Sequence, residues 1–241
     1  MQIHWTSLIK VVEESSEVKT FYFDVPEGFT WVEGSFTHLA LKGFNEGEKP
    51  NRSLVRHMSI CTLPEEGKIG ITTRIRNKRS EYKDRLDHLA IGDKAALFKT
   101  VSHVPLRREN NNIYFLSQGV GIATIRPLVA KYIADRSKIH HVHSLNIDSS
   151  KEFLFAELFS SANEKNFTAQ FVDSRANYYE QAKQLAEDTQ GIFYIVGSDE
   201  FLIQNINMLI AEGIRREQIM IDKRENQREQ FFPVKQSVSL N

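Results

Sequence analysis

The sequence predicts two domains of different class: an N-terminal antiparallel β-barrel over residues 1–108, then a doubly wound α/β domain with a parallel sheet over residues 112–222. Three observations predict this division. Short β-prone runs separated by turn residues fill the first part, strands alternate with helices in the second, and a wholly polar run at residues 107–112 divides them. The remaining residues, 223–241, are mostly polar and are expected to form a tail.

The barrel strands are predicted from β-branched and aromatic runs that end at turn residues. Residues 20–25 are rich in such side chains and stop at Pro26. Residues 69–75 alternate, so that the isoleucines at positions 69, 71 and 75 share one face of a strand. The predicted strands of this domain are residues 20–25, 38–41, 56–60, 69–75 and 94–98.

In the second domain, apolar strands and helical stretches follow each other, which is typical of a parallel sheet covered on both faces. In the clearest helix, residues 199–212, leucine and isoleucine side chains form one stripe before Gly213 ends it. Ser150 is expected to cap a helix that starts at Lys151. The predicted strands are residues 113–116, 139–145, 168–172, 192–196 and 219–221, and the predicted helices are residues 124–135, 151–161, 178–188 and 199–212.

The bulk properties argue against several classes of protein. Lys plus Arg and Asp plus Glu both number 31, so the formal net charge is zero and no nucleic-acid partner is expected. The single cysteine, Cys61, can form neither an internal disulfide nor the four-thiolate set of an iron–sulfur cluster. The chain has no basic region followed by an apolar run at its N-terminus and no stretch as long as a membrane span. A cytoplasmic protein without a membrane partner is therefore expected.

A glycine turn follows the first predicted strand of the second domain, where a doubly wound domain binds dinucleotide phosphates. Gly119 and Gly121 permit positive φ and leave room for a phosphate. The third glycine of the usual fingerprint is missing, because Thr124 stands in that region. The alternative is a tight strand-to-helix turn that binds no ligand.

A second candidate site is the predicted strand at residues 56–60. Arg56 and Met58 share one face of this strand, whereas His57 and Ser59 share the other. A flavin nucleotide at the strand end could use the Arg56 guanidinium for its phosphate and the Ser59 hydroxyl near its ring. The alternative is an exposed arginine and a serine without a function.

Basic residues follow the fourth predicted strand of the barrel and lead into a predicted helix at residues 81–89. Backbone N–H groups at a helix start, together with nearby cations, favour a pyrophosphate. The alternative is a solvated, charged loop. The run covers residues 74–80, and its charged and hydroxyl side chains are Arg74, Arg76, Lys78, Arg79 and Ser80.

Ser174 and Arg175 follow the third predicted strand of the second domain. A hydroxyl and a guanidinium placed there could hold the adenosine 2′-phosphate of NADP, because the planar guanidinium fork matches a phosphate. A carboxylate at this place would instead favour the ribose hydroxyls of NAD. Asp173 keeps that alternative open.

His140, His141 and His143 have the side chains of metal ligands. His141 and His143 would share one face of a strand. No cysteine or carboxylate lies beside them in the sequence, so no metal site is expected.

Taken in this order, the motifs resemble those of the ferredoxin–NADP reductase family over nearly the whole chain. Residues 56–59 match the family's Arg-x-Tyr-Ser motif, and residues 119–126 match Gly-x-Gly-Ile-Ala-Pro-x-Arg. Residues 174–175 are similar to the Ser-Arg pair of NADP-dependent members, and residues 194–197 to a Tyr-x-Cys-Gly segment. Residues 78–80 loosely match the loop that cradles the flavin pyrophosphate.

The resemblance implies an FAD-dependent oxidoreductase that transfers a hydride from NAD(P)H to flavin. Because no iron–sulfur domain is present, it implies a separate acceptor: ferredoxin, flavodoxin, free flavin or a ferric chelate. The implied cofactors are FAD and NADP, with FMN and NAD as alternatives. Family members place the serine matched by Ser59 beside flavin N5, so Ser59 is the implied catalytic residue. The implied cofactor-binding residues are Arg56, His57, Met58, Ser59, Thr72, Thr73, Arg74, Lys78, Arg79, Ser80, Gly119, Gly121, Thr124, Ser174, Arg175, Gly197 and Ser198.

The chain departs from the family pattern at several positions. Met58 stands where a tyrosine packs on the flavin ring, and Val196 where many members have a cysteine near the nicotinamide. Thr124 replaces a proline, and residues 98–102 replace an expected Gly-Pro-x-Gly stretch. These departures leave two other functions open: a non-catalytic flavin-binding or interaction subunit that has lost nicotinamide turnover, and a reductase that treats free flavin as its substrate.

Overall fold

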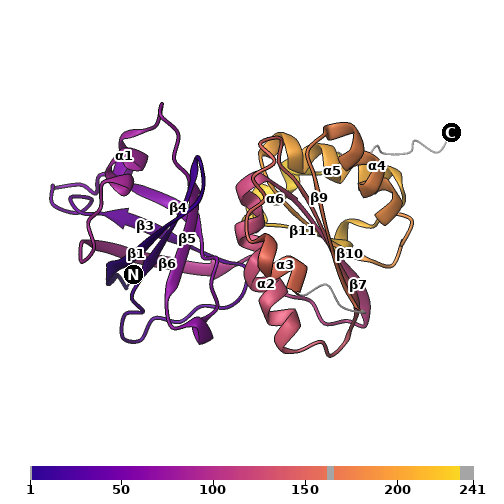
Figure 1. Cartoon of the computed structure of the whole chain (residues 1–241), viewed down its shortest axis with the longest axis horizontal. Coiled ribbons are helices and arrows are strands. Elements are labelled where there is room, and N and C mark those ends of the chain that lie inside the picture. Colours follow the sequence, from indigo (N-terminus) through magenta and orange to yellow (C-terminus); the bar gives the residue numbers. More distant parts are fainter. Residues whose placement is uncertain (1, 162–165, 234–241) are drawn as a thin grey trace.

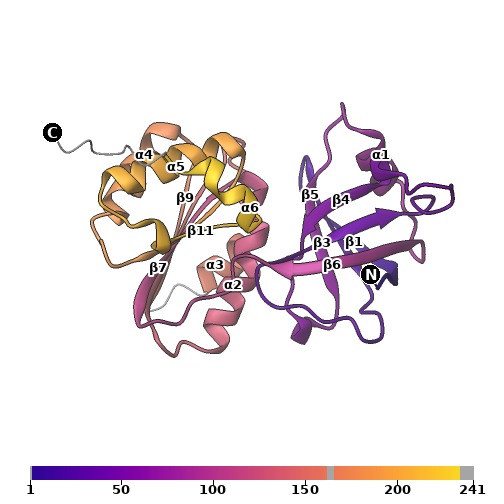
Figure 2. The same ribbon diagram turned by 180° about the vertical axis from the view of Figure 1, so that it is seen from behind.

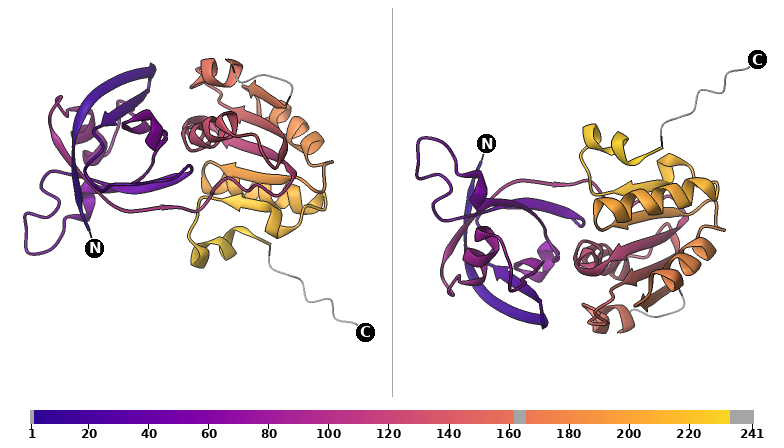
Figure 3. Two further views of the ribbon diagram at one scale, coloured as in Figure 1. Left: turned by 90° about the horizontal axis from the view of Figure 1, so that it is seen from below. Right: turned by 90° about the horizontal axis from the view of Figure 1, so that it is seen from above.

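A computed structural model describes residues 2–161 and 166–233 and shows two domains side by side (Figure 1). The first is a six-stranded antiparallel half-barrel, and the second is a five-stranded parallel sheet with helices on both faces. The predicted fold class is thus confirmed. An extended segment between the last barrel strand and the first strand of the parallel sheet joins the domains (Figure 3).

The half-barrel has the strand order β4-β3-β6-β1-β2-β5, so β4 and β5 are its two open edges. One short helix, α1, packs against the core of the half-barrel. Tyr82 and Leu86 of this helix are fully buried, and the Tyr82 hydroxyl donates to the Leu39 carbonyl at 3.1 Å. The elements are β1 (His4–Ser15), β2 (Val18–Phe23), β3 (Ser35–Leu41), β4 (Val55–Ser59), β5 (Ile69–Arg74), α1 (Glu81–Asp87) and β6 (Lys94–Ser102).

The sequence analysis missed β1, although it is the longest strand of the barrel. The pairing of β1 with β2 shifts register twice, between Leu8 and Lys10 and between Glu13 and Ser15. Each shift breaks the alternation of buried and exposed side chains on which strand prediction relies.

The parallel sheet has the strand order β11-β10-β7-β8-β9, and an apolar cluster covers each face. Along β7, Ile113 and Phe115 enter one cluster, whereas Tyr114 and Leu116 enter the other. No helix in the described part of the chain has both the length and the apolar character needed to cross a membrane. The elements are β7 (Asn111–Gln118), α2 (Ile122–Ala134), β8 (Ile139–Ile147), α3 (Ala156–Ser161), β9 (Phe167–Val172), α4 (Arg175–Leu185), β10 (Ile192–Val196), α5 (Asp199–Ala211), β11 (Ile219–Ile221) and α6 (Glu225–Arg228).

The predicted helix at residues 151–161 is shorter than expected and begins at Ala156. The Asp148 carboxylate accepts from the backbone N–H of Ser150 at 2.9 Å, which makes a turn rather than a helix cap. Lys151 then adopts a left-handed backbone conformation with φ of 62°, which a right-handed helix excludes.

Residues 223–233 differ from the expected tail, because they fold against the α/β domain. Helix α6 lies on the side of this domain that faces the barrel (Figure 2). Phe231 and Phe232 are buried in the same apolar cluster as α5, and the Arg216 guanidinium lies 4.3 Å from the centre of the Phe232 ring. Residues 234–241 lie outside the described residues.

Polar side chains of α2 bind the barrel directly. Arg126 donates to both carboxylate oxygens of Glu66, at 2.8 and 2.9 Å, and to the Cys61 carbonyl at 2.7 Å. One turn further along α2, the Lys131 ammonium lies 3.0 Å from the Glu65 carboxylate. The first turns of α2 are therefore fixed against the segment that follows β4.

We expect Phe231→Ala to lower the free energy of unfolding by about 3 kcal/mol, because it empties a buried site in the core of the α/β domain. Urea unfolding measures this, with Ile203→Ala as the control, since Ile203 is a partly exposed residue of α5. An unchanged unfolding midpoint for Phe231→Ala would show that the C-terminal segment does not contribute to the core.

Candidate functional site

A cavity of about 330 Å³ lies between the domains, at the carboxyl ends of β7 and β10. The strand order of the parallel sheet reverses between these two strands, which is where doubly wound domains bind ligands. The barrel edges β4 and β5 supply the opposite wall. Of the predicted site residues, His57, Met58, Ser59, Thr72, Thr73, Gly121, Thr124 and Gly197 line this interdomain cavity.

Two hydroxyl groups meet in the interdomain cavity, one from each domain. Thr124, in the first turn of α2, donates through its Oγ1 to the Ser59 Oγ at 2.9 Å. Since the Ser59 hydroxyl accepts this bond, its own hydrogen remains available to donate to a group in the cavity. Thr124 stands where the motif that the chain resembles has proline. Proline has no hydroxyl, so it could not donate this hydrogen bond.

Two cations converge beside the interdomain cavity, and neither forms an ion pair with any of the described residues. Arg56 donates to the Val55 carbonyl at 2.7 Å, and its guanidinium lies 5.1 Å from the centre of the Tyr82 ring. The Lys83 ammonium donates to the hydroxyl of Thr73, which lines the cavity. Burial, with the Arg56 charge as the second cause, lowers the pKa of Lys83 to about 8. A bound anion would relieve this repulsion, so the pair suits a phosphate.

Lys83 was not among the residues predicted from the sequence, which placed the anion at the basic run before it. In the structure, Arg79 is paired with Asp84, its Nη2 lying 3.0 Å from the carboxylate, and Lys78 is exposed. Ser80 caps α1, because its hydroxyl accepts from the backbone N–H of Lys83. These three predicted residues lie outside the cavity lining, and no motif in the sequence distinguishes Lys83 from the other lysines.

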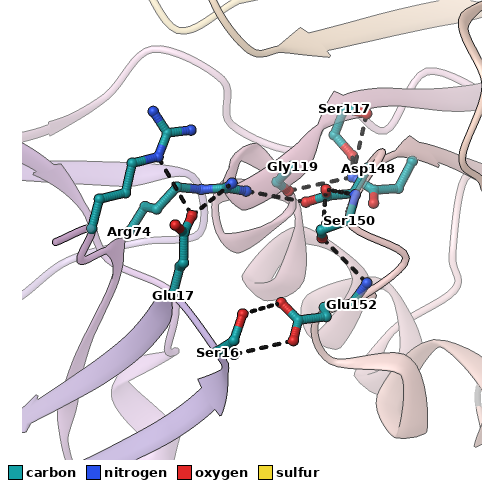
Figure 4. Close-up of polar contacts among 10 residues, drawn as sticks. Ser16, Glu17, Arg74, Ser117, Gly119, Asp148, Ser150 and Glu152 are labelled. Carbon is teal, nitrogen blue, oxygen red and sulfur yellow. Dashed lines mark hydrogen bonds and ion pairs between the residues drawn. The ribbon is translucent and has the colours of Figure 1, made fainter. Parts of the chain in front are cut away.

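Arg74 also turns away from the interdomain cavity and crosses to the α/β domain (Figure 4). Its Nη2 lies 3.2 Å from the Oδ2 of Asp148, beside the backbone of Gly119. Gly119 has a positive φ of 52°, and a Cβ atom there would lie 3.3 Å from that Asp148 oxygen. Ser16 and Glu152 add a hydrogen bond of 2.8 Å nearby. The outer side of the glycine turn is thus covered by contacts between the domains.

The other predicted glycines have a packing reason for their identity. A Cβ atom on Gly121 would lie 2.7 Å from the Val196 carbonyl oxygen, so only glycine lets α2 start this close to β10. A Cβ atom on Gly197 would lie 2.5 Å from the Phe201 ring. Ser198 caps α5 by accepting from the backbone N–H of Phe201 at 3.2 Å. These contacts explain the glycines without a ligand, although both glycines face the cavity.

The predicted 2′-phosphate site lies on the surface, outside the cavity lining. Ser174 caps α4, and Arg175 is paired with Glu200, its Nη2 lying 3.0 Å from the carboxylate. Asp173 is paired with the Lys151 ammonium at 2.9 Å. The charges of Arg175 and Asp173 are therefore both compensated within the chain.

Asp222 is a further cavity residue that the sequence analysis missed. It follows β11 and lines the interdomain cavity, and its Oδ1 is shielded from solvent and has no hydrogen-bond partner among the residues that the structure describes. The adjacent Lys223 is paired instead with Asp199 at 2.7 Å. Burial raises the pKa of Asp222 to about 6. Its place at the carboxyl end of a parallel strand is the signal that could have identified it.

The described residues contain no group of three or more His, Cys, Asp or Glu side chains arranged to hold a metal ion. His141 and His143 both contact the hydroxyl of Thr168, at 3.0 and 2.7 Å. The two histidines therefore form side-chain hydrogen bonds between the neighbouring strands β8 and β9.

No family model and no curated protein matches the chain. Several solved structures, in contrast, are similar to the chain. A ferredoxin NADP+ reductase from Neisseria gonorrhoeae, with bound FAD and NADP, is similar with a TM-score of 0.76 and 16% identity, over 92% of this chain and 98% of that one. A cytochrome P450 reductase from Amycolatopsis is similar with a TM-score of 0.77 and 13% identity, over 96% of this chain and 70% of that one.

The fold is that of the ferredoxin–NADP reductases. The CS-b5R domains of human Ncb5or, in the NAD+ form, share it with a TM-score of 0.75 and 15% identity, over 92% of this chain and 70% of that one. The resemblance inferred from the motifs is thus confirmed for the fold. At these identities the likeness carries no residue roles, so the function rests on the site itself.

Asp222 is expected to cost stability at neutral pH. Its folded pKa of about 6 lies above the ordinary aspartate value, so the carboxyl favours folding at low pH, and this contribution is lost as the pH rises through about 6. We therefore expect Asp222→Asn to raise the free energy of unfolding at pH 7.5 by up to about 3 kcal/mol, from a shift of about 2 units. Urea unfolding at several pH values measures this, and the gain should vanish near pH 4. A variant that is less stable than wild type at pH 7.5 would contradict the assignment.

Proposed function

We propose that the protein is an FAD-dependent oxidoreductase that takes a hydride from NAD(P)H and passes the electrons to a separate acceptor. The observation that carries this proposal is the convergence of Arg56 and Lys83, without an acidic partner in the described chain, beside the interdomain cavity. A phosphate-bearing cofactor would satisfy both charges. The ferredoxin NADP+ reductase from Neisseria gonorrhoeae, which has this fold, was solved with FAD and NADP bound.

The residues present fit a flavin nucleotide. Arg56 and Lys83 would hold its pyrophosphate, and Met58, Ser59 and Thr73 would lie along its ring at the gap between β4 and β5. The bound flavin supplies the redox chemistry, since it accepts a hydride and passes electrons on. The Ser59 hydroxyl, held by Thr124, would donate to the ring edge, and the Met58 thioether would contact the ring where the family has tyrosine.

The α/β domain would bind the nicotinamide nucleotide at the switch point of its sheet. Gly121 and Gly197 line the cavity at the ends of β7 and β10, where the nicotinamide would face the flavin site. We place the adenosine 2′-phosphate of NADPH at Ser174 and Arg175, with Asp173 held away by Lys151. This placement rests on the resemblance of residues 174–175 to the Ser-Arg pair of NADP-dependent members, and the 2′-phosphate would replace Glu200 as the partner of Arg175. On that ground NADPH is the preferred donor in this proposal.

Asp222 would bind and release a proton in the interdomain cavity. With a pKa of about 6, its carboxyl exchanges a proton near neutral pH, and its Oδ1 has no partner within the described chain. Hydride transfer from a nicotinamide leaves a proton to be taken up at the acceptor, and a carboxyl with this pKa suits that task. We also propose a cytoplasmic location, in keeping with the buried, unpaired thiol of Cys61.

A second candidate function is a flavin-binding subunit without nicotinamide turnover. Met58 and Val196 depart from the family pattern, and the Arg74–Asp148 ion pair covers the outer side of the Gly119 turn. In that case the flavin site would be filled, but the nicotinamide would not reach it.

The acceptors open to the first function, the FAD-dependent oxidoreductase, are ferredoxin, flavodoxin, free flavin and ferric chelates.

Anaerobic addition of NADPH to the FAD-loaded protein is expected to bleach the flavin absorbance. Ser59→Ala should slow this reduction at saturating NADPH while leaving the affinity for FAD within a few-fold, because a hydroxyl at the reacting edge acts mostly in the transition state. Stopped-flow absorbance provides both rates. Unbleached flavin in the wild type would favour the non-catalytic subunit, and equal rates would make Ser59 a structural residue.

The affinity of the apo-protein for FAD is expected to fall as the pH rises through about 8, because Lys83 loses its proton there and one of two cations disappears. Lys83→Met should weaken binding at least about tenfold at pH 7, the effect of one charge-assisted hydrogen bond, and should remove the pH dependence. Fluorescence titration measures this, with Lys78→Met as the control. An unaltered pH profile in Lys83→Met would place the pyrophosphate elsewhere.

A further inference from the structure

A second cavity, of about 610 Å³, lies on the other face of β4 from Arg56. We call it the outer cavity. The barrel strands β3, β4 and β6 form its floor, the loop that contains Phe44 and Arg52 forms one wall, and Arg224 reaches it from the α/β domain. Its volume is in the range of sites for small molecules and cofactors.

The outer cavity has an aromatic wall. The Phe98 ring is stacked between Phe44, at 5.8 Å and 18°, and His38, at 5.1 Å and 8°. His57 stands edge-on to His38 at 4.0 Å. Phe44, Phe98 and His38 are 4%, 7% and 9% exposed, so a flat ring would meet the rims of these rings and the exposed imidazole of His57.

Three cations, Arg52, Lys99 and Arg224, line the outer cavity, and no Asp or Glu side chain lines it. None of the three forms an ion pair within residues 2–161 and 166–233. Burial is the main cause that lowers the pKa of His38, to about 4, and of His57, and Lys99 and Arg224 lower both pKa values further. The imidazoles are therefore neutral at neutral pH, and the uncompensated positive charge of the outer cavity comes from the three cations.

A β-bulge places Lys99 at this site. Between the pairs Phe36–Val101 and His38–Phe98, Lys99 and Thr100 of β6 oppose Thr37 alone. Lys99 adopts a positive φ of 52°, a conformation that disfavours a side chain other than glycine, asparagine or aspartate. Backbone strain of this kind persists at ligand sites, where it directs a required side chain.

We propose that the outer cavity binds a planar aromatic anion, namely free flavin mononucleotide, as the electron acceptor. The isoalloxazine ring would lie against the rim of the aromatic wall and the exposed His57 imidazole, and the terminal phosphate would bind the three cations. His57 lines both the outer cavity and the interdomain cavity, so an acceptor here lies next to the proposed redox site.

The role as acceptor rests on the proposed function, whereas binding does not. The overall reaction balances: NADPH gives up a hydride, one proton comes from solvent, and flavin mononucleotide gains two electrons and two protons. NADP+ and the reduced mononucleotide are the products.

Binding of flavin mononucleotide to FAD-saturated protein, without NADPH, tests the site directly. We expect one equivalent to bind with its fluorescence quenched, and riboflavin, which lacks the phosphate, to bind at least tenfold more weakly. Lys99→Asn and Arg52→Gln should each weaken the mononucleotide about tenfold and leave riboflavin unchanged. Asparagine tolerates the backbone of position 99, so the fold is preserved, and the exposed Lys10→Gln is the control.

In turnover, the same variants should raise KM for flavin mononucleotide about tenfold at constant kcat, while NADPH-driven reduction of ferricyanide stays unchanged. Absence of a second binding equivalent, equal binding of riboflavin, or wild-type affinity in both variants would overturn the proposal. Binding without any NADPH turnover would leave the outer cavity as a ligand site but would overturn both the acceptor role and the proposed function.

Discussion

The two walls of the interdomain cavity belong to different domains, and the pairing of Arg126 with Glu66 fixes the spacing between them. Arg126 lies one half-turn beyond Thr124 on α2, and its second contact, to the Cys61 carbonyl, fastens it to the chain just after β4. The pair is largely shielded, with 19% and 26% of the two side chains exposed, so solvent screens it weakly. The Thr124–Ser59 hydrogen bond of 2.9 Å joins the same two elements as this ion pair.

Most of the fold was predictable because local patterns and packing agree. The parallel sheet appeared in the sequence as alternating strands and helices, and only details were lost: β1 at its register shifts, the start of α3 at a left-handed Lys151, and the C-terminal segment. That segment is polar except for its two phenylalanines. Two adjacent apolar residues show no periodicity from which a buried element could be predicted. The residues that bury them come from other parts of the folded domain.

The site was less predictable because the sequence does not show which charged side chains are paired with an opposite charge. Arg56 and Arg79 look alike in the sequence, but Asp84 compensates only the second. Lys83 and Asp222 carry no motif. Among the described residues, Lys83 is partly buried without an ion-pair partner and the Asp222 Oδ1 is buried without a hydrogen-bond partner, and both environments arise from elements distant in the chain. Ser59 was accessible to sequence reasoning because the motif around it occupies one short strand.

The open edges of the half-barrel affect how readily the chain aggregates. β4 and β5 end the sheet, and each presents a row of backbone groups that no neighbouring strand satisfies. Exposed strand edges are templates for pairing with other polypeptides. If a flavin lies along this gap, it covers both edges, so its binding would oppose aggregation of the barrel as well as supply the redox chemistry.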